Sequence, residues 1–207
     1  MPRPRRIYMP DFAVHVCQRG IDRRTIYLDD DDRARYLTTL AAKASKHGTD
    51  VHAFTLMSNH YHLISTPRSE TALAETMRRA NWSYTRYFNR KYRRTGPLWN
   101  ERPRVIPLED ERQWFTCLRY VEFNPVRAGI VTAPDEYRWS SHRVHAHGQR
   151  SDWLVLHPLY IGLGKTGTER QAAYRAMCSI PLTNAEVELQ RQPPPRITQP
   201  QSVIATG

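Results

Sequence analysis

Two histidines, His60 and His62, are the first residues whose type and spacing suggest chemistry. They lie two positions apart in a short run with the alternation of a β-strand. Because side chains alternate across a strand, both imidazoles would point to one face and could share a metal ion. The alternative is that they are core histidines with hydrogen-bonded partners.

A tyrosine and an asparagine four residues apart form the second candidate group. Tyr120 and Asn124 lie on one flank of a helix predicted over 109–124, which would half-expose the phenol to a cleft. A tyrosine hydroxyl has a pKa of about 10 and is a weak nucleophile until a metal or a base assists it. The Asn124 amide oxygen could be a third ligand beside the imidazoles, and Arg127 could neutralise a phosphate. The alternative is that Tyr120 only packs.

The charge of the chain indicates a polyanionic partner. The sequence has 31 Lys and Arg against 20 Asp and Glu, a formal net charge of +11, which favours nucleic acid first and an acidic membrane surface second. A helix predicted over 69–93 has a basic face with an exposed tryptophan, which suits a single-stranded nucleic acid and a stacking platform. An ordinary solvated face is the alternative. The predicted DNA contacts are Arg3, Arg5, Arg6, Arg78, Arg79, Trp82, Arg86, Arg90, Arg93 and Arg127.

Several other functional classes are disfavoured. The three cysteines are far apart and form no CxxC, which argues against a disulfide framework and a cysteine zinc site. The run 162–166 resembles a phosphate loop, but Leu159 occupies the position of its first glycine. No apolar stretch approaches the ~18 residues that span a bilayer, and no apolar segment follows the basic N-terminus as in a secretory signal. We therefore expect a globular cytoplasmic protein.

Two polar clusters have simple structural explanations. The four aspartates at 29–32 precede a helical pattern that ends at His47-Gly48, so we interpret them as helix caps rather than a metal cluster. A second histidine pair, His145 and His147, lies in a polar stretch with no strand pattern. We predict surface histidines there.

Periodicity predicts the elements that would position these residues. Strands are expected at 11–19, at 51–57 and 60–66 as a hairpin, and at 102–106. Besides the helices already given, a small helix is expected at 168–178. We divide the chain into a catalytic domain over 1–150, a C-terminal helical extension over 151–182, and a tail over 183–207, rich in Gln and Pro, that is expected to be disordered.

Two segments together resemble a known family. The run 57–63, Met-Ser-Asn-His-Tyr-His-Leu, looks like the His-hydrophobic-His motif of HUH-class single-strand DNA transposases, and 119–129, Arg-Tyr-Val-Glu-Phe-Asn-Pro-Val-Arg-Ala-Gly, looks like their catalytic-tyrosine helix. The residues of these two segments are most similar to those of the REP-associated tyrosine transposases, which are relatives of the small insertion-sequence transposases. The likeness runs over about residues 1–182 and is supported by the short motifs at 18–20, 87–89, 96–99 and 137–141.

This resemblance implies an α+β fold of the ferredoxin-like (RRM-like) type, an antiparallel sheet flanked by helices. It implies that His60, His62 and Asn124 hold Mg²⁺ or Mn²⁺ and that Tyr120 is the nucleophile. The enzyme would cleave and rejoin single-stranded DNA at hairpin-forming, REP-like palindromes through a 5′-phosphotyrosine intermediate. The resemblance favours a monomer associated with the nucleoid. Imidazole ligands suit ions softer than Mg²⁺, so we expect Mn²⁺ to work.

The chain departs from this family in two places, at Glu101-Arg102-Pro103 and beyond residue 182. Two other functions stay open: a non-catalytic binder of single-stranded DNA or RNA, and a metal-dependent phosphodiesterase that uses water as its nucleophile.

Overall fold

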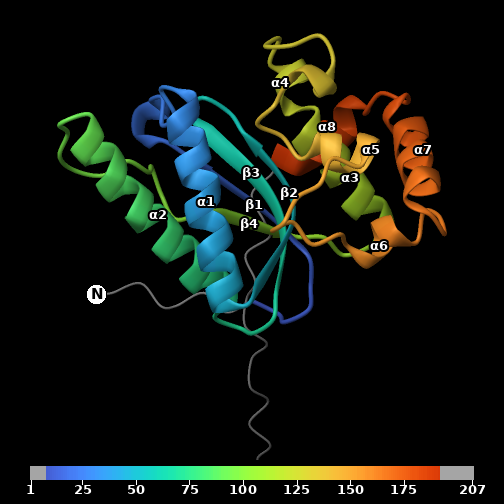
Figure 1. The fold of residues 1–207 in the computed structure, drawn as a ribbon, viewed down its shortest axis with the longest axis horizontal. Helices are drawn as coiled ribbons and strands as arrows, with labels where there is room; N and C mark the ends of the chain where they lie inside the picture. Colours follow the sequence, from blue (N-terminus) through green and yellow to red (C-terminus); the bar gives the residue numbers. More distant parts are fainter. Residues whose placement is uncertain (1–7, 192–207) are drawn as a thin grey trace, which may run out of the picture.

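The computed structural model describes residues 8–191 and is built on a four-stranded antiparallel sheet with helices on both faces (Figure 1). The strands lie in the order β2-β3-β1-β4. The first elements follow one another as strand, helix, strand, strand, helix, strand, which with this order is the ferredoxin-like arrangement. Their bounds are β1 Val14–Arg19, α1 Asp30–His47, β2 Thr49–Leu56, β3 His60–Pro67, α2 Ala72–Lys91 and β4 Arg104–Pro107. The expected α+β class is confirmed.

Successive side chains of β3 point to opposite faces of the sheet. Tyr61 and Leu63 belong to the core beneath α1 and α2, whereas Ile64 belongs to the core on the other face. His60 and His62 alternate with Tyr61 and Leu63, so they face away from α1 and α2. The predicted hairpin forms at Ser58-Asn59, where the Met57 amide donates to the His60 carbonyl at 2.8 Å.

The aspartates at 29–32 form the N-cap and first turn of α1, in agreement with their interpretation as caps. The Asp29 side chain accepts from the Asp32 amide, and Gly48 ends the helix in the left-handed conformation. Asp32 is buried, and the Lys91 ammonium of α2 lies 2.8 Å from its carboxylate. The cluster therefore joins α1 to α2.

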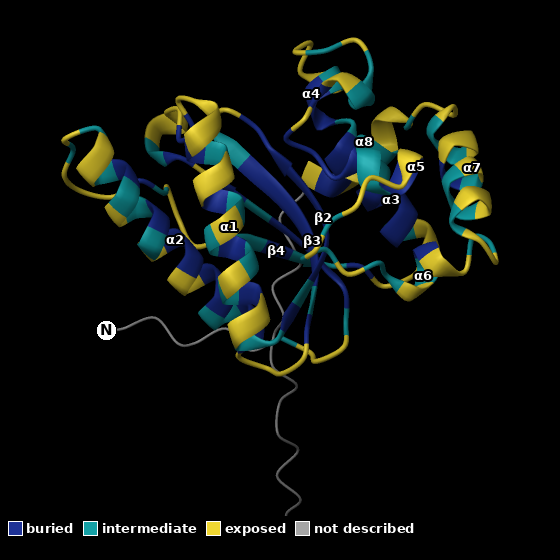
Figure 2. Cartoon of the chain, viewed as in Figure 1, coloured by how far each residue is buried: buried dark blue, intermediate teal, exposed yellow. Residues whose placement is uncertain are grey.

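The opposite face of the sheet is covered by α3, Glu111–Glu122, which is mostly buried (Figure 2). Asp110 caps its start, and its carboxylate accepts from the Gln113 amide. The helix ends at Glu122, and a short helix α4, Asn124–Arg127, follows with Pro125 in its first turn. Asn124 and Arg127 of α4 line one cavity with His60 and His62 of β3.

The remaining segments pack beside α3 (Figure 1). They form the helices α5 His142–His147, α6 Pro158–Ile161, α7 Gly167–Cys178 and α8 Asn184–Arg191, with a 3₁₀ turn at Pro134–Glu136. Tyr160 and Tyr174 are buried in the same core as Trp114 and Leu118 of α3. No helix within residues 8–191 is long and apolar enough to cross a bilayer.

Two expectations about elements need correction. The expected disorder from residue 183 is wrong for Asn184–Arg191, which forms α8 and packs on α3 through Val187; residues 192–207 lie outside the described chain. The segment 142–147, for which no helix was expected, forms α5. Both helices are short, and packing against α3 stabilises them more than their own propensity does.

Candidate active site

His62 is held in place by a third histidine that the sequence analysis did not single out. His62 is buried on β3, and its Nδ1 lies 2.9 Å from Nε2 of His15 on β1. The two rings stack with centroids 5.1 Å apart. The sequence could have indicated His15 as a candidate, because alternation along the strand predicted at 11–19 places His15, Cys17 and Arg19 on one face.

Tyr120 lies directly against this histidine pair. Its ring centroid is 5.5 Å from that of His62 and 5.8 Å from that of His15. The phenol is buried, with a relative exposure of 4%, so the expectation of a half-exposed side chain is wrong. The reason is Arg127, whose Cζ lies 3.9 Å from the ring centroid, while its Nη1 donates to the Tyr120 carbonyl at 2.9 Å.

Asn124 and His60 complete the arrangement. Asn124 is buried at the start of α4 and lines the same cavity as His60. His60 Nδ1 lies 2.7 Å from Oδ1 of Asn59. The structure thus brings together His60, His62, Tyr120 and Asn124.

The three imidazoles are neutral near pH 7. Burial, helped by Arg104, lowers the pKa of His15 to about 3. Burial and then Arg19 lower the pKa of His60 to about 4, against the opposing effect of Asn124. Burial, followed by His15 and His60, holds the pKa of His62 well below its usual value. Each ring therefore keeps a lone pair free for a cation or a hydrogen bond.

The residues present fit a divalent cation. Metal-binding histidines usually donate their other ring N–H to a fixed acceptor, and His15 Nε2 lies 2.9 Å from His62 Nδ1, where it accepts when His62 carries its proton on Nδ1. With that tautomer, the His62 Nε2 lone pair is available to an ion beside His60 and the Asn124 amide oxygen. His15 Nδ1 is a buried atom without a hydrogen-bond partner among the described residues, so the hydrogen bond with His62 is made by the other nitrogen of that ring.

A strongly basic cavity surrounds these groups. Its volume is about 830 Å³, and its walls include His60, His62, Tyr120 and Asn124. Six arginines also line it: Arg19, Arg23, Arg102, Arg104, Arg127 and Arg191. Only Arg127 was predicted from the sequence. Arg104 was missed because its place depends on the pairing of β4 with β1, where it is opposite Cys17.

The other predicted DNA contacts lie elsewhere. Trp82 is 57% exposed on α2, the guanidinium of Arg86 lies 4.8 Å from its ring centroid, and both line a groove with Arg35 and Arg90. The exposed Arg78 and Arg79 pair with Glu75 of the same helix, and Arg93 is exposed just after the helix. Since α2 and α3 cover opposite faces of the sheet, these residues on and just after α2 do not line the Tyr120 cavity. Arg3, Arg5 and Arg6 lie outside the described residues.

The prediction of two surface histidines on 145–147 is wrong for His145. This residue is fully buried, and its Nδ1 lies 2.7 Å from the carboxylate of Glu122 at the end of α3. Glu122 is also fully buried. Burial alone would raise the pKa of Glu122, but His145 and His142 hold it well below its usual range. His147 is half-exposed.

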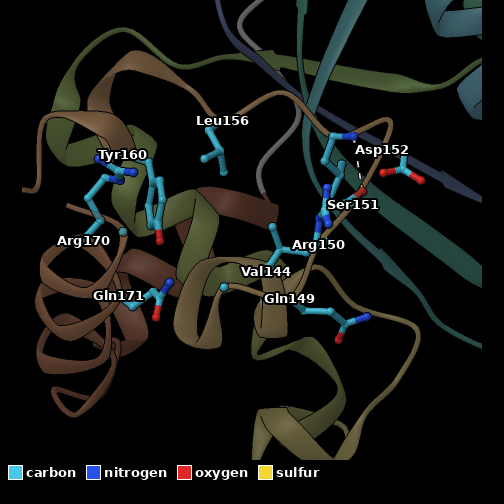
Figure 3. Close-up of a pocket in the computed structure, with 12 residues that line it drawn as sticks. Val144, Gln149, Arg150, Ser151, Asp152, Leu156, Tyr160, Arg170 and Gln171 are labelled. Atoms are coloured by element: carbon cyan, nitrogen blue, oxygen red, sulfur yellow. Dashed lines mark hydrogen bonds between the residues drawn. The ribbon is translucent and has the colours of Figure 1, made fainter. Parts of the chain in front are cut away.

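A second pocket lies among the C-terminal segments (Figure 3). It has a volume of about 380 Å³, and Arg150, Tyr160, Arg170 and Gln171 are among the residues around it. It shares no lining residue with the Tyr120 cavity, so it is separate from the candidate active site.

Comparison with known proteins gives a family and similar solved structures. The sequence model of IS200-like transposases matches residues 9–124, a range that includes both histidines, Tyr120 and Asn124. The fold is similar to a solved REP-associated tyrosine transposase bound to a REP hairpin, with a TM-score of 0.55 and 16% identity over 76% of this chain and 93% of the other. A putative transposase from Deinococcus radiodurans matches with a TM-score of 0.41 and 17% identity over 55% of this chain and 91% of the other.

Among curated proteins, none matches the sequence significantly. The family match covers more than half of the chain. The chain belongs to the IS200-like transposase family.

Proposed function

We propose that this transposase cleaves and rejoins single-stranded DNA with Tyr120 as its nucleophile. The Tyr120 oxygen attacks the phosphorus of a phosphodiester, and the bond to the 3′ oxygen breaks. The products are a 5′-phosphotyrosine and a strand that leaves with a free 3′-OH, which takes up a proton. In the joining step another 3′-OH attacks the phosphotyrosine and releases the phenol, so no external energy source is needed.

The observation that carries this proposal is the contact of the Tyr120 ring with His62 inside a cavity lined by six arginines. A phosphodiester placed there would meet a nucleophile and positive charge together. Guanidinium groups bind phosphate through two parallel hydrogen bonds and stabilise the charge that develops on its oxygens.

Arg127 is the arginine best placed to act on the reacting phosphate. Its guanidinium already covers the Tyr120 ring, and burial, the main cause, lowers its pKa from the ordinary arginine value. An arginine that lies over the nucleophile in the free enzyme can turn to the phosphate when DNA enters. That exchange would also uncover the phenol.

A divalent cation, Mg²⁺ or Mn²⁺, would be held by His60, His62 and Asn124. When bound, it would polarise a phosphate oxygen as a Lewis acid. Among the described residues, the chain's own part is to present two neutral imidazoles on one strand face and one amide on α4.

The DNA substrate is proposed to be a short hairpin with a single-stranded flank, like a REP element. Two observations support it: the fold is shared with the transposase solved with a REP hairpin, and the basic groove on α2 could bind a second part of the same DNA. We further propose that the protein acts as a monomer in the cytoplasm, in association with the nucleoid.

The test is covalent capture of DNA. Labelled hairpins with randomised single-stranded flanks are incubated with the protein and Mn²⁺, and a protein–DNA adduct is sought on a denaturing gel. We expect an adduct for the native protein and for Tyr92→Phe, which removes a hydroxyl outside the cavity, and none for Tyr120→Phe. An adduct with Tyr120→Phe would show that another residue is the nucleophile.

The same assay separates the other two functions. Cleavage without an adduct, retained in Tyr120→Phe, would indicate a phosphodiesterase that uses water. Salt-sensitive binding without cleavage, unchanged by His60→Ala or by a chelator, would indicate a nucleic-acid-binding protein.

A further inference from the structure

A second group of metal-binding side chains lies away from the candidate active site. Asp135, His142 and His147 each offer a ligand atom, and these atoms lie within 4.8 Å of one another. Nε2 of His142 is 2.9 Å from Oδ1 of Asp135, and Nε2 of His147 is 3.0 Å from the same oxygen. The 3₁₀ turn and α5 supply them, and none of them lines the Tyr120 cavity.

His142 is positioned from behind by a buried carboxylate. Its Nδ1 lies 3.2 Å from Oε2 of Glu122, and both side chains are buried. Glu122 is itself fixed by Ser141, His145 and Tyr174, which lie 2.5–2.7 Å from its carboxylate oxygens. A histidine whose Nδ1–H is held by a carboxylate, with Nε2 directed outward, is the usual form of a metal-binding histidine.

The contacts of Asp135 argue against simple hydrogen bonding. Its Oδ1 is a buried atom that receives no hydrogen bond of acceptable direction in the described chain, although two ring nitrogens lie within about 3 Å. The N–H directions of the two rings therefore miss the oxygen. In a neutral His142 with Nδ1–H toward Glu122, the Nε2 lone pair faces an anionic oxygen, and a cation between the two groups would remove that repulsion.

The separation of Asp135 Oδ1 from each histidine nitrogen, 2.9 and 3.0 Å, suits a metal ion, and a bound ion would draw together the two nitrogens, which lie within 4.8 Å of each other. Bonds of about 2.1 Å at angles of 90–110° place two ligand atoms about 3.0–3.4 Å apart. Two imidazoles and one carboxylate are a common ligand set for Zn²⁺ and related transition metals, with water filling the open positions. We propose that Asp135, His142 and His147 form a site for a divalent transition-metal ion. Zn²⁺ is the ion that this set of ligands suits best.

The site would have a structural role near the active site. It would join the turn Pro134–Glu136 to α5, and through Glu122 it would join both to the end of α3. Tyr120 lies two residues before Glu122 on that helix. The metal would hold the part of the helix that carries Tyr120, without contacting the DNA.

The experiment measures Zn²⁺ alone, by its stoichiometry after dialysis and by the shift it causes in Tm. His147→Ala and Asp135→Asn change side chains that are about half-exposed, so folding should be preserved. Each is compared with a matched control outside the site, His47→Ala or Asp152→Asn. All are made both in the native chain and in a His60→Ala background, which removes a ligand of the candidate active site.

In the His60→Ala background we expect one Zn²⁺ per chain in the controls, and at least a tenfold weaker Zn²⁺ affinity with loss of the Tm shift in His147→Ala and Asp135→Asn. Co²⁺ should give a visible absorption spectrum that depends on the same two residues. Equal Zn²⁺ binding in the variants and their controls would overturn the proposal and leave an ion-paired cluster. Failure of covalent DNA capture would not affect this result, because the two sites share no residue.

Discussion

His15 Nε2 lies 2.9 Å from His62 Nδ1, and both rings lie edge-on to the ring of Tyr120. One buried histidine on β1 thus fixes the orientation of a candidate metal ligand on β3. The partner of His62 Nδ1 decides which of its ring nitrogens carries the proton. The outward Nε2 can bind a cation only if Nδ1 donates to His15.

We therefore predict that His15→Leu lowers the affinity for Mn²⁺ about 10–100-fold, the range typical for loss of such an orienting partner. His15→Gln should restore most of it, because the glutamine oxygen can accept the same hydrogen bond. Calorimetric titration with Mn²⁺ in an Asp135→Asn background measures this. His52→Gln, a change at another buried histidine, is the control. If His15→Leu folds normally and binds Mn²⁺ like the native chain, His15 has only a packing role.

Substitution of the exposed Trp82 tests whether single-stranded DNA binds in the groove on α2. Its ring is open to solvent beside Arg86, so a base can stack on it at little cost to folding. Trp82→Ala should weaken single-stranded DNA binding by about 1–3 kcal/mol, and Trp82→Phe by less. Fluorescence anisotropy at fixed salt measures the affinity. Ile161→Ala, at another exposed apolar residue, should have no effect, and an unchanged affinity in Trp82→Ala would place the DNA elsewhere.

A substitution of Glu122 tests the packing at the end of α3, the helix that carries Tyr120. Its buried carboxylate accepts from Ser141 and Tyr174 and contacts two histidines. Glu122→Leu leaves these groups without their partner, so it should lower the free energy of unfolding by about 3–5 kcal/mol. Urea denaturation measures the loss. The exposed Glu188→Leu should change stability by less than about 0.5 kcal/mol. Similar losses in both variants would mean that the network contributes little.

Much of the fold could be predicted from local patterns. The strands and helices around His60, His62 and Tyr120 formed close to their expected bounds, and the aspartates at 29–32 cap the start of α1. Alternation along a strand and the 3.6-residue period of a helix are local properties, so they are written in adjacent residues. They also place both histidines on the same side of the strand.

The partners of buried polar groups could not be predicted in this way. His15 meets His62 only because β1 pairs with β3 in one register. His145 can be buried because its Nδ1 contacts the carboxylate of Glu122, 23 residues earlier in the chain. Tyr120 is covered because α4 turns Arg127 back over its ring.

The sequence by itself therefore determined the elements, the family and the types of residue that can do the chemistry. Only the tertiary structure decided which charges surround Tyr120. It also decided that the basic residues of α2 lie on the other face of the sheet, and that Asp135, His142 and His147 come together. The physical reason is that burial and charge–charge contacts depend on distances between segments far apart in the chain. Local periodicity fixes the face of a residue but not the group that it meets there.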